Sequence, residues 1–148
     1  MKSGRPSLFV LVAILGLTSA RIYDRCDLAR ELRGRPDVAK EHVPTWVCIA
    51  FHESRFDTSA IGRANGDWSW DHGLFQLNDR YWCGRDAPGG VCQIPCSALR
   101  DRNISDDLRC AKAVFDEHRR ISGDGFNAWT TYGNCKGYDA RKFVEGCF

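Results

Sequence analysis

The chain has 148 residues, 43% of them hydrophobic and 27% charged, which is enough for one compact domain with a modest core. Its 21 basic residues nearly balance its 19 acidic ones, and no basic block gathers in one segment. The composition therefore gives no reason to expect a nucleic-acid partner.

The first twenty residues have the features of a secretory signal peptide. A positively charged start precedes an apolar run of ten residues, Leu8 to Leu17, and small residues follow up to Ala20. Ten apolar residues are too few to span a bilayer, and no second apolar run follows, so a membrane anchor is the weaker alternative. We expect residues 1–20 to be removed and residues 21–148 to form one secreted, monomeric domain.

Two helices are predicted next. The first has Asp24 as its N-cap and apolar residues at helical spacing, until Gly34 and a following proline end it. The second begins at Pro44, because proline suits the first helical turn, and ends near Ser54. This places Glu53 in its last turn.

The segment from Asp57 to Asn78 has the pattern of a small antiparallel sheet. Asn65-Gly66 is a hairpin signal, and a second turn is predicted at His72-Gly73, which puts Asp71 beside that turn.

The rest of the chain is predicted to be a loop followed by helices. Residues 83–96 are rich in glycine and proline and contain three cysteines, so they favour a disulfide-stapled loop. Helical spacing returns from about Ile104 to Arg119 and again after Asn127. Helices on both sides of a small sheet indicate an α+β fold in two lobes.

All eight cysteines lie after the predicted signal peptide. An even number of cysteines behind an export signal indicates a disulfide framework, although the count alone leaves on the order of 100 pairings open. Zinc is disfavoured, because there is no Cys-x-x-Cys pair and the four histidines are dispersed.

Two acidic residues differ from the others in their surroundings. Glu53 is expected at a helix C-terminus beside apolar side chains, and both features disfavour its ionised form and raise its pKa. Asp71 has polar neighbours that can hydrogen-bond a carboxylate, so we expect it to stay ionised. These neighbours are Ser69, His72, Gln76 and Asn78. Two carboxyl groups shifted in opposite directions are typical of a glycosidase. The alternative is that both are ordinary solvated acids at the ends of elements.

Beyond this pair, the sequence from residue 21 to 148 resembles the c-type lysozyme and α-lactalbumin family, in an invertebrate-like form. The family's type member is the standard example of such a carboxyl pair. The resemblance lies in the order of the cysteines and in six motifs: "RCDLARELR", "WVCIAFHESRF", "DHGLFQLNDRYWC", "CQIPCSAL", "GFNAW" and "CKG".

The resemblance implies a two-lobed lysozyme fold with the active-site cleft between the lobes. It gives Glu53 the role of general acid and Asp71 that of nucleophile or stabiliser. The expected reaction is retaining cleavage of the β-1,4 bond between N-acetylmuramate and N-acetylglucosamine in bacterial peptidoglycan, with chitooligosaccharides as further ligands and no cofactor required. The sugar-binding residues would be Asn78, Tyr81, Trp82, Ala128 and Trp129, and Trp129 could equally fill the core.

The family's disulfide pairing implies four bridges in this chain. They would be Cys26–Cys147, Cys48–Cys135, Cys83–Cys96 and Cys92–Cys110.

Several features depart from the family pattern. Tyr81 stands where many members have tryptophan, and Cys135 follows Trp129 one residue early. Without the signal peptide, which contains two basic residues, the chain has 19 basic and 19 acidic residues and is neutral, whereas many antibacterial members are basic. Trp68 and Trp70 have no family role, and packing on the hairpin surface is the expected use.

An acidic stretch ahead of the third predicted helix resembles the calcium loop of α-lactalbumin and of some lysozymes. It is not an EF-hand, since Lys112 occupies the position of the bidentate glutamate. The alternative is that these acids favour the start of a helix, balanced by nearby arginines. The calcium ligands would be the side chains of Asp101, Asp106 and Asp107 and the carbonyls of Ala98 and Asn103.

Two functions are compatible with this resemblance. The first is a secreted, bacteriolytic and antimicrobial lysozyme used in defence or in digestion of bacteria. The second is a non-catalytic carbohydrate-binding or regulatory protein of the α-lactalbumin type. Those relatives typically lack one or both acids, whereas this chain has Glu53 and Asp71, so the enzyme is favoured.

Overall fold

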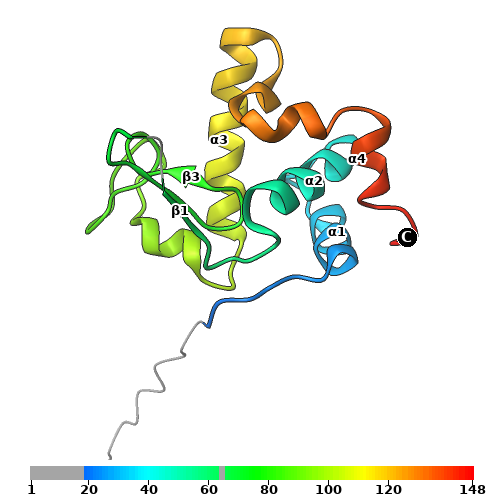
Figure 1. Cartoon of the computed structure of the whole chain (residues 1–148), viewed down its shortest axis with the longest axis horizontal. Coiled ribbons are helices and arrows are strands. Elements are labelled where there is room, and N and C mark those ends of the chain that lie inside the picture. The colour runs from blue at the N-terminus through cyan, green and yellow to red at the C-terminus, as the bar shows by residue number, and fades with distance from the viewer. Residues whose placement is uncertain (1–18, 64–65) are drawn as a thin grey trace, which may run out of the picture.

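The computed structural model describes residues 19–63 and 66–148, so residues 1–18 of the predicted signal peptide and Asn65 of the hairpin signal lie outside the described residues. Helices form one part of the molecule and a three-stranded sheet with its loops forms the other, with the long helix α3 between them (Figure 1). This arrangement confirms the α+β class.

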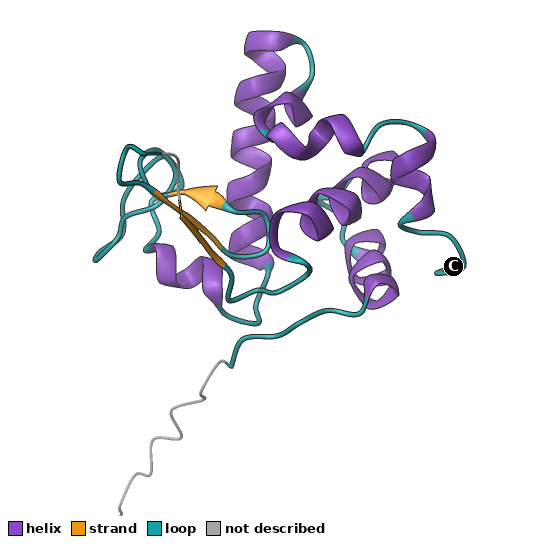
Figure 2. Ribbon diagram, viewed as in Figure 1, coloured by secondary structure: helices purple, strands orange, loops and turns teal. Residues whose placement is uncertain are grey.

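The described residues contain four α-helices and four short 3₁₀ turns. Figure 2 shows most of the helices on the side of the molecule away from the sheet. The α-helices are α1 (Arg25–Gly34), α2 (Val43–Ser54), α3 (Ser105–Ser122) and α4 (Tyr138–Lys142). The 3₁₀ turns are η1 (Lys40–His42), η2 (Cys96–Arg100), η3 (Gly125–Ala128) and η4 (Thr130–Asn134).

The two predicted N-terminal helices are confirmed, and their caps explain where they begin and end. The Asp24 carboxylate accepts hydrogen bonds from the backbone N–H groups of Cys26 and Asp27, which starts α1. Helix α2 ends because Arg55 adopts the left-handed conformation (φ 55°, ψ 34°). Glu53 is therefore in the last turn of α2, as predicted.

The sheet is antiparallel and very short. Its strands β1 (Ile61–Arg63), β2 (Trp70–His72) and β3 (Leu77–Asn78) pair in the order β1-β2-β3. Asp71 lies in the middle of β2, so the prediction that it lies beside the turn was wrong. The second turn starts one residue later than predicted, because His72 still pairs with Leu77.

The helical segment predicted after Asn127 does not form one regular helix. After Trp129 the chain first forms the 3₁₀ turn η4, and the short α-helix α4 follows it. The shortened spacing between Trp129 and Cys135 is met by this tighter turn, which closes with Cys135 N–H donating to the Tyr132 carbonyl.

An aromatic cluster joins the helices to the sheet side. Trp46 of α2 packs edge-on against Phe75, Phe126 and Trp129, with ring centroids 4.9–5.3 Å apart. Because Phe75 belongs to the connection between β2 and β3, this cluster fixes the sheet against α2.

Four disulfides staple the fold, in the pairing that the resemblance implied. They are Cys26–Cys147, Cys48–Cys135, Cys83–Cys96 and Cys92–Cys110. The first two close loops of 121 and 87 residues and so constrain the unfolded chain strongly. The last two hold the loop after β3 and tie it to α3. In the described part of the chain, no helix has the length and apolar character needed to span a membrane.

Candidate active site

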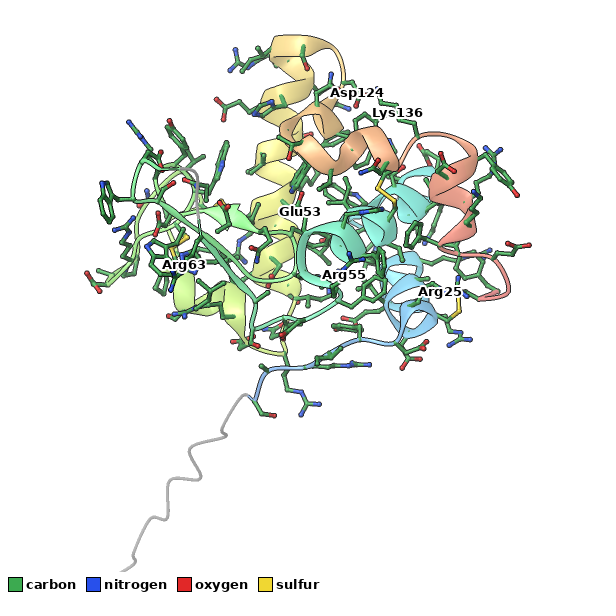
Figure 3. The ribbon with its side chains drawn as sticks, in the orientation of Figure 1. Arg25, Glu53, Arg55, Arg63, Asp124 and Lys136 are labelled. Atoms are coloured by element: carbon green, nitrogen blue, oxygen red, sulfur yellow. A yellow bond between two sulfur atoms is a disulfide. The ribbon has the colours of Figure 1, made fainter. Side chains whose placement is uncertain are left out.

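Glu53 lies between the helices and the sheet (Figure 3). One carboxyl oxygen, Oε1, accepts a 2.6 Å hydrogen bond from the hydroxyl of Thr131. Burial raises the pKa of Glu53 above its usual value, the Thr131 hydrogen bond opposes that effect, and the nearby charge of Asp71 adds to it. Glu53 therefore retains its proton to higher pH than an exposed glutamate, as a general acid must.

The residue after Glu53 fixes the end of α2 to the sheet side. The buried hydroxyl of Ser54 contacts the carbonyl oxygens of Ala50, at 2.9 Å, and Leu74, at 2.8 Å. Because Leu74 lies two residues after the end of β2, this contact sets the last turn of α2 relative to the strand that holds Asp71.

Asp71 is held at the centre of the sheet. It pairs in register with Gly62 on β1 and with Asn78 on β3. The amide of Asn78 donates hydrogen bonds to Asp71 Oδ1, at 2.8 Å, and to Ser69 Oγ, at 2.9 Å. Gly62 leaves room for this arrangement, since a Cβ there would lie 2.3 Å from Gln76 Oε1.

Most of the polar side chains expected to hydrogen-bond Asp71 bond other groups. Gln76 donates instead to the carbonyls of Ala60 and Gly73, and Ser69 donates to Asp67. His72 alternates to the opposite face of β2, where its Nε2 lies 3.4 Å from Asp79 Oδ2. Of the four predicted partners, Asn78 is the one that contacts the Asp71 carboxylate.

The pKa of Asp71 is raised, which corrects the prediction that the two carboxyl groups shift in opposite directions. Burial is the main cause, and the hydrogen bond from Asn78 and the neighbouring His72 partly offset it. Sequence reasoning missed this because it counted hydrogen-bonding groups and not the burial of β2. The charge of Asp71 in turn adds to the raised pKa of Glu53.

Both carboxyl groups line one cleft of about 200 Å³. Four of the predicted sugar-binding residues line it with them: Asn78, Trp82, Ala128 and Trp129. Tyr81, the fifth, lies in a second hollow of about 530 Å³ that shares Trp82 with the cleft, and we call the two together the groove.

Trp129 has both of the uses considered for it. It is only 6% exposed, and its indole N–H donates a 2.9 Å hydrogen bond to the Phe75 carbonyl in the core. It also forms part of the cleft wall. Core packing therefore fixes a surface that sugar rings can contact.

Several residues in or beside the groove were not singled out from the sequence. Thr131 bonds Glu53 from η4, and Glu117 and His118 of α3 line the hollow beside Tyr81. Thr131 was hidden because it is 78 residues away from Glu53 and has no motif of its own. Its position follows from the Cys48–Cys135 disulfide, which ties η4 to α2.

The candidate calcium residues are described by the structure but do not converge. Asp101 caps the N–H of Asn103, and Asp106 pairs with Arg109 at 2.5 Å. Asp107 is fully buried, with Oδ1 accepting from the Leu74 N–H at 3.3 Å and Oδ2 without a partner. The clusters whose ligand atoms lie within 4.8 Å of one another in the described residues do not include these three aspartates.

These residues fit calcium in chemistry, and one ion pair within the segment would have to break for them to gather around an ion. Calcium prefers carboxylate and carbonyl oxygens, and the unpartnered Oδ2 of Asp107 is an atom that a cation would satisfy. The arrangement described here would need Asp106 to exchange Arg109 for the ion.

Two tight groups of candidate metal ligands do occur, but both contain bridged cysteines. They are His72 with Cys83 and Cys96, and His52 with Cys48 and Cys135. Each cysteine pair is a disulfide, and disulfide sulfur lacks the thiolate that binds zinc.

A helical lobe and a small sheet that share a cleft, with two carboxyl groups facing it, define an enzyme of the lysozyme type. The sequence profile of the C-type lysozyme/alpha-lactalbumin family matches residues 21–147, and the chain belongs to this family.

Its relatives come from invertebrates and vertebrates. It is similar to Lysozyme C of Penaeus merguiensis, with 40% identity over 144 residues that cover 95% of this chain and 90% of the relative. Lysozyme c-1 of Anopheles gambiae is 36% identical over the full length of both chains. A crystal structure of a lysozyme from Litopenaeus vannamei superposes with a TM-score of 0.78 at 37% identity, and covers 86% of this chain and 98% of that one.

Proposed function

We propose that this protein hydrolyses the β-1,4 bond between N-acetylmuramate and N-acetylglucosamine in bacterial peptidoglycan, with retention at the anomeric carbon. The observation that supports it best is the pair Glu53 and Asp71 in one cleft, with the Glu53 pKa raised by burial and by the charge of Asp71.

The proposed reaction has two steps. Glu53 gives its proton to the glycosidic oxygen while the Asp71 carboxylate attacks or stabilises the anomeric carbon, so the bond to the leaving sugar breaks. The ionised Glu53 then takes a proton from a water molecule that adds to the same carbon and releases Asp71. Two displacements at one carbon preserve its configuration, and no cofactor is needed.

The lining of the groove supports a sugar substrate. Pyranose rings have C–H faces that pack on aromatic planes, and Tyr81, Trp82 and Trp129 offer such planes along the groove. The amide of Asn78 holds Asp71 from within the sheet. We propose that chitooligosaccharides bind in the same groove, and that the protein acts as a monomer in defence against bacteria or in their digestion.

Substitution of the two acids tests this function. Glu53→Gln fills the same volume but cannot donate the proton, so wall hydrolysis should fall by about 10²–10⁴-fold with the fold intact. Asp71→Asn should also impair hydrolysis, because the developing positive charge is left unstabilised. Clearing of bacterial walls is the measurement. More than about a tenth of the normal rate in Glu53→Gln would refute the general-acid role, and sugar binding without hydrolysis in the parent would favour the α-lactalbumin type of function.

We also propose secretion, with cleavage between Ala20 and Arg21. The contacts of Arg21 support this site. Its backbone N donates a 2.8 Å hydrogen bond to Oγ1 of the buried Thr58, and its carbonyl accepts from the Thr58 N–H at 2.9 Å. A new α-ammonium at Arg21 keeps that donor. Sequencing of the secreted protein should begin at Arg21, and a different first residue would contradict the proposed site.

A further inference from the structure

A second hollow lies on the face of the sheet opposite the catalytic Asp71. Successive side chains of a strand point to opposite faces, so Trp70 lies on the other face from Asp71. Arg63 pairs with Trp70 in register and shares its face. Together with Trp68 and neighbouring turn residues, they line a hollow of about 310 Å³. Figure 3 shows Arg63 on the sheet side of the molecule, away from Glu53.

The fold gives no reason for tryptophan at position 68. The side chain of Trp68 is 83% exposed, so it adds almost nothing to the core. Its backbone has φ 63°, a left-handed conformation that glycine adopts freely and a bulky residue adopts only at a cost in free energy. Arg85 holds this turn through the carbonyl of Trp68, a contact that any residue could make.

The neighbouring tryptophan is also open to solvent. Trp70 is 39% exposed, although it lies in the central strand of the sheet. Two large exposed aromatic side chains in one hollow form an apolar surface that the described chain does not cover.

The charge beside this surface indicates what it would bind. The guanidinium carbon of Arg63 lies 5.9 Å from the centre of the Trp70 ring, and no carboxylate in the described parts of the chain pairs with it. An aromatic plane next to an available cation suits a sugar ring that has a carboxylate nearby. Peptidoglycan has both features, because it is a chain of sugar rings whose peptide stems carry carboxylates.

The hollow and the cleft are two faces of one hairpin. Ser69 lines the hollow, and its hydroxyl accepts a hydrogen bond from Asn78, which also bonds Asp71 in the cleft. A glycan polymer bound at the hollow therefore raises the effective concentration of neighbouring glycan chains at the cleft.

We propose that Arg63, Trp68 and Trp70 form a second glycan-binding site, which holds the enzyme on acidic, insoluble wall polymer while the cleft cuts it. This inference rests on the proposed peptidoglycan substrate. The site is separate from the reacting atoms, so it affects retention on the wall and not the chemical step.

Binding to purified, insoluble peptidoglycan tests the site when hydrolysis is blocked by Glu53→Gln. Adding Trp68→Gly and Trp70→Thr should weaken binding by about tenfold, which is the effect of losing a stacked ring. The matched control is Tyr138→Ala, because Tyr138 is a 66% exposed aromatic residue on α4 and should leave binding unchanged. Equal binding of the double variant and the control would overturn the proposal.

Two further measurements separate this inference from the proposed function and from misfolding. In the active enzyme, Trp68→Gly with Trp70→Thr should slow wall clearing but leave hydrolysis of a soluble chitooligosaccharide unchanged. A parent that cleaves neither substrate would refute the proposed function, whereas cleavage of both with unaltered wall clearing in the variant would refute only the second site.

Arg63→Gln should weaken binding to peptidoglycan but not to uncharged chitin, and equal loss on both would exclude the acidic partner.

Discussion

The hydrogen bond from Thr131 opposes the effect of burial on the pKa of Glu53, the proposed general acid. A donor to a carboxylate favours the charged form, so Thr131 lowers a pKa that burial raises. Burial and the hydrogen bond from Thr131, which is 78 residues away in the sequence, thus change the pKa of Glu53 in opposite directions.

Thr131→Val should move the pH dependence of the enzyme. Valine has a similar volume but no donor, so the pKa of Glu53 should rise. The general acid works while protonated, and activity is lost as the pH rises through its pKa, so the alkaline limb of kcat/KM should shift to higher pH. Thr131→Ser should keep the normal limb, and so should Thr130→Val, which alters the cleft wall alone. An unchanged limb in Thr131→Val would show that the hydrogen bond does not tune Glu53.

Glu53 should also make the stability of the protein depend on pH. Its pKa is raised by folding, so the folded state binds its proton more tightly than the unfolded state. This contribution to stability is present below the unfolded pKa of about 4.3 and is lost as the pH rises through the folded pKa. Urea unfolding of Glu53→Gln should therefore show a smaller loss of stability with rising pH over that window. Parallel curves for the two proteins would contradict it.

At the scale of elements, the end of α2 and the start of the β2–β3 connection act as one unit through Ser54. The Ser54 hydroxyl lies against two carbonyls, one from each element. Glu53, the proposed general acid, precedes Ser54 directly, so this link sets the position of Glu53 relative to Asp71.

Ser54→Ala should cost about 1 kcal/mol of stability and reduce kcat, because the Leu74 carbonyl loses its link and Glu53 is held less firmly. The control is Ser122→Ala at the end of α3, where the hydroxyl also bonds the carbonyl four residues back but is exposed. Urea unfolding and kcat on a soluble substrate measure both effects. Equal behaviour of the two variants would refute the role of Ser54.

The sequence predicts the elements with local signals and misses those fixed by distant contacts. The Asp24 cap and the apolar spacing are enough to locate α1, and proline with apolar spacing locates α2. The extent of β2 depends on the pairing of His72 with Leu77, and the form of η4 depends on the Cys48–Cys135 bridge. For the same reason Glu53 and Asp71 could be selected from local context, whereas Thr131 could not.

For the whole molecule, the balance of charge limits how the enzyme finds its substrate. With residues 1–20 removed, 19 basic and 19 acidic residues remain, so there is little long-range attraction to an anionic wall. Short-range contacts along the groove and at the second hollow would then supply the retention that basic relatives gain from charge.

Bound calcium would change both the net charge of the protein and its stability to unfolding. Asp107 is buried at zero exposure with Oδ2 unpartnered, and burial raises its pKa well above the usual value. Asp101 and Asp106 add to this effect through their charges. A bound Ca²⁺ would relieve the repulsion and bring the mature chain to about +2, by the addition of two charges to a neutral chain.

We predict that millimolar calcium raises the thermal unfolding midpoint of the secreted protein relative to chelator. Binding to the folded state alone stabilises by about 2.7 kcal/mol at a hundredfold excess over Kd, which corresponds to a shift on the order of 10 °C. Asp107→Asn should remove the response, because it deletes one ligand while keeping the shape of the buried side chain. In chelator the same variant should be more stable than the parent, since a neutral amide is buried at lower cost than a carboxylate. Equal midpoints of the parent in calcium and in chelator would contradict calcium binding and leave Asp106 as a partner of Arg109 at the start of α3.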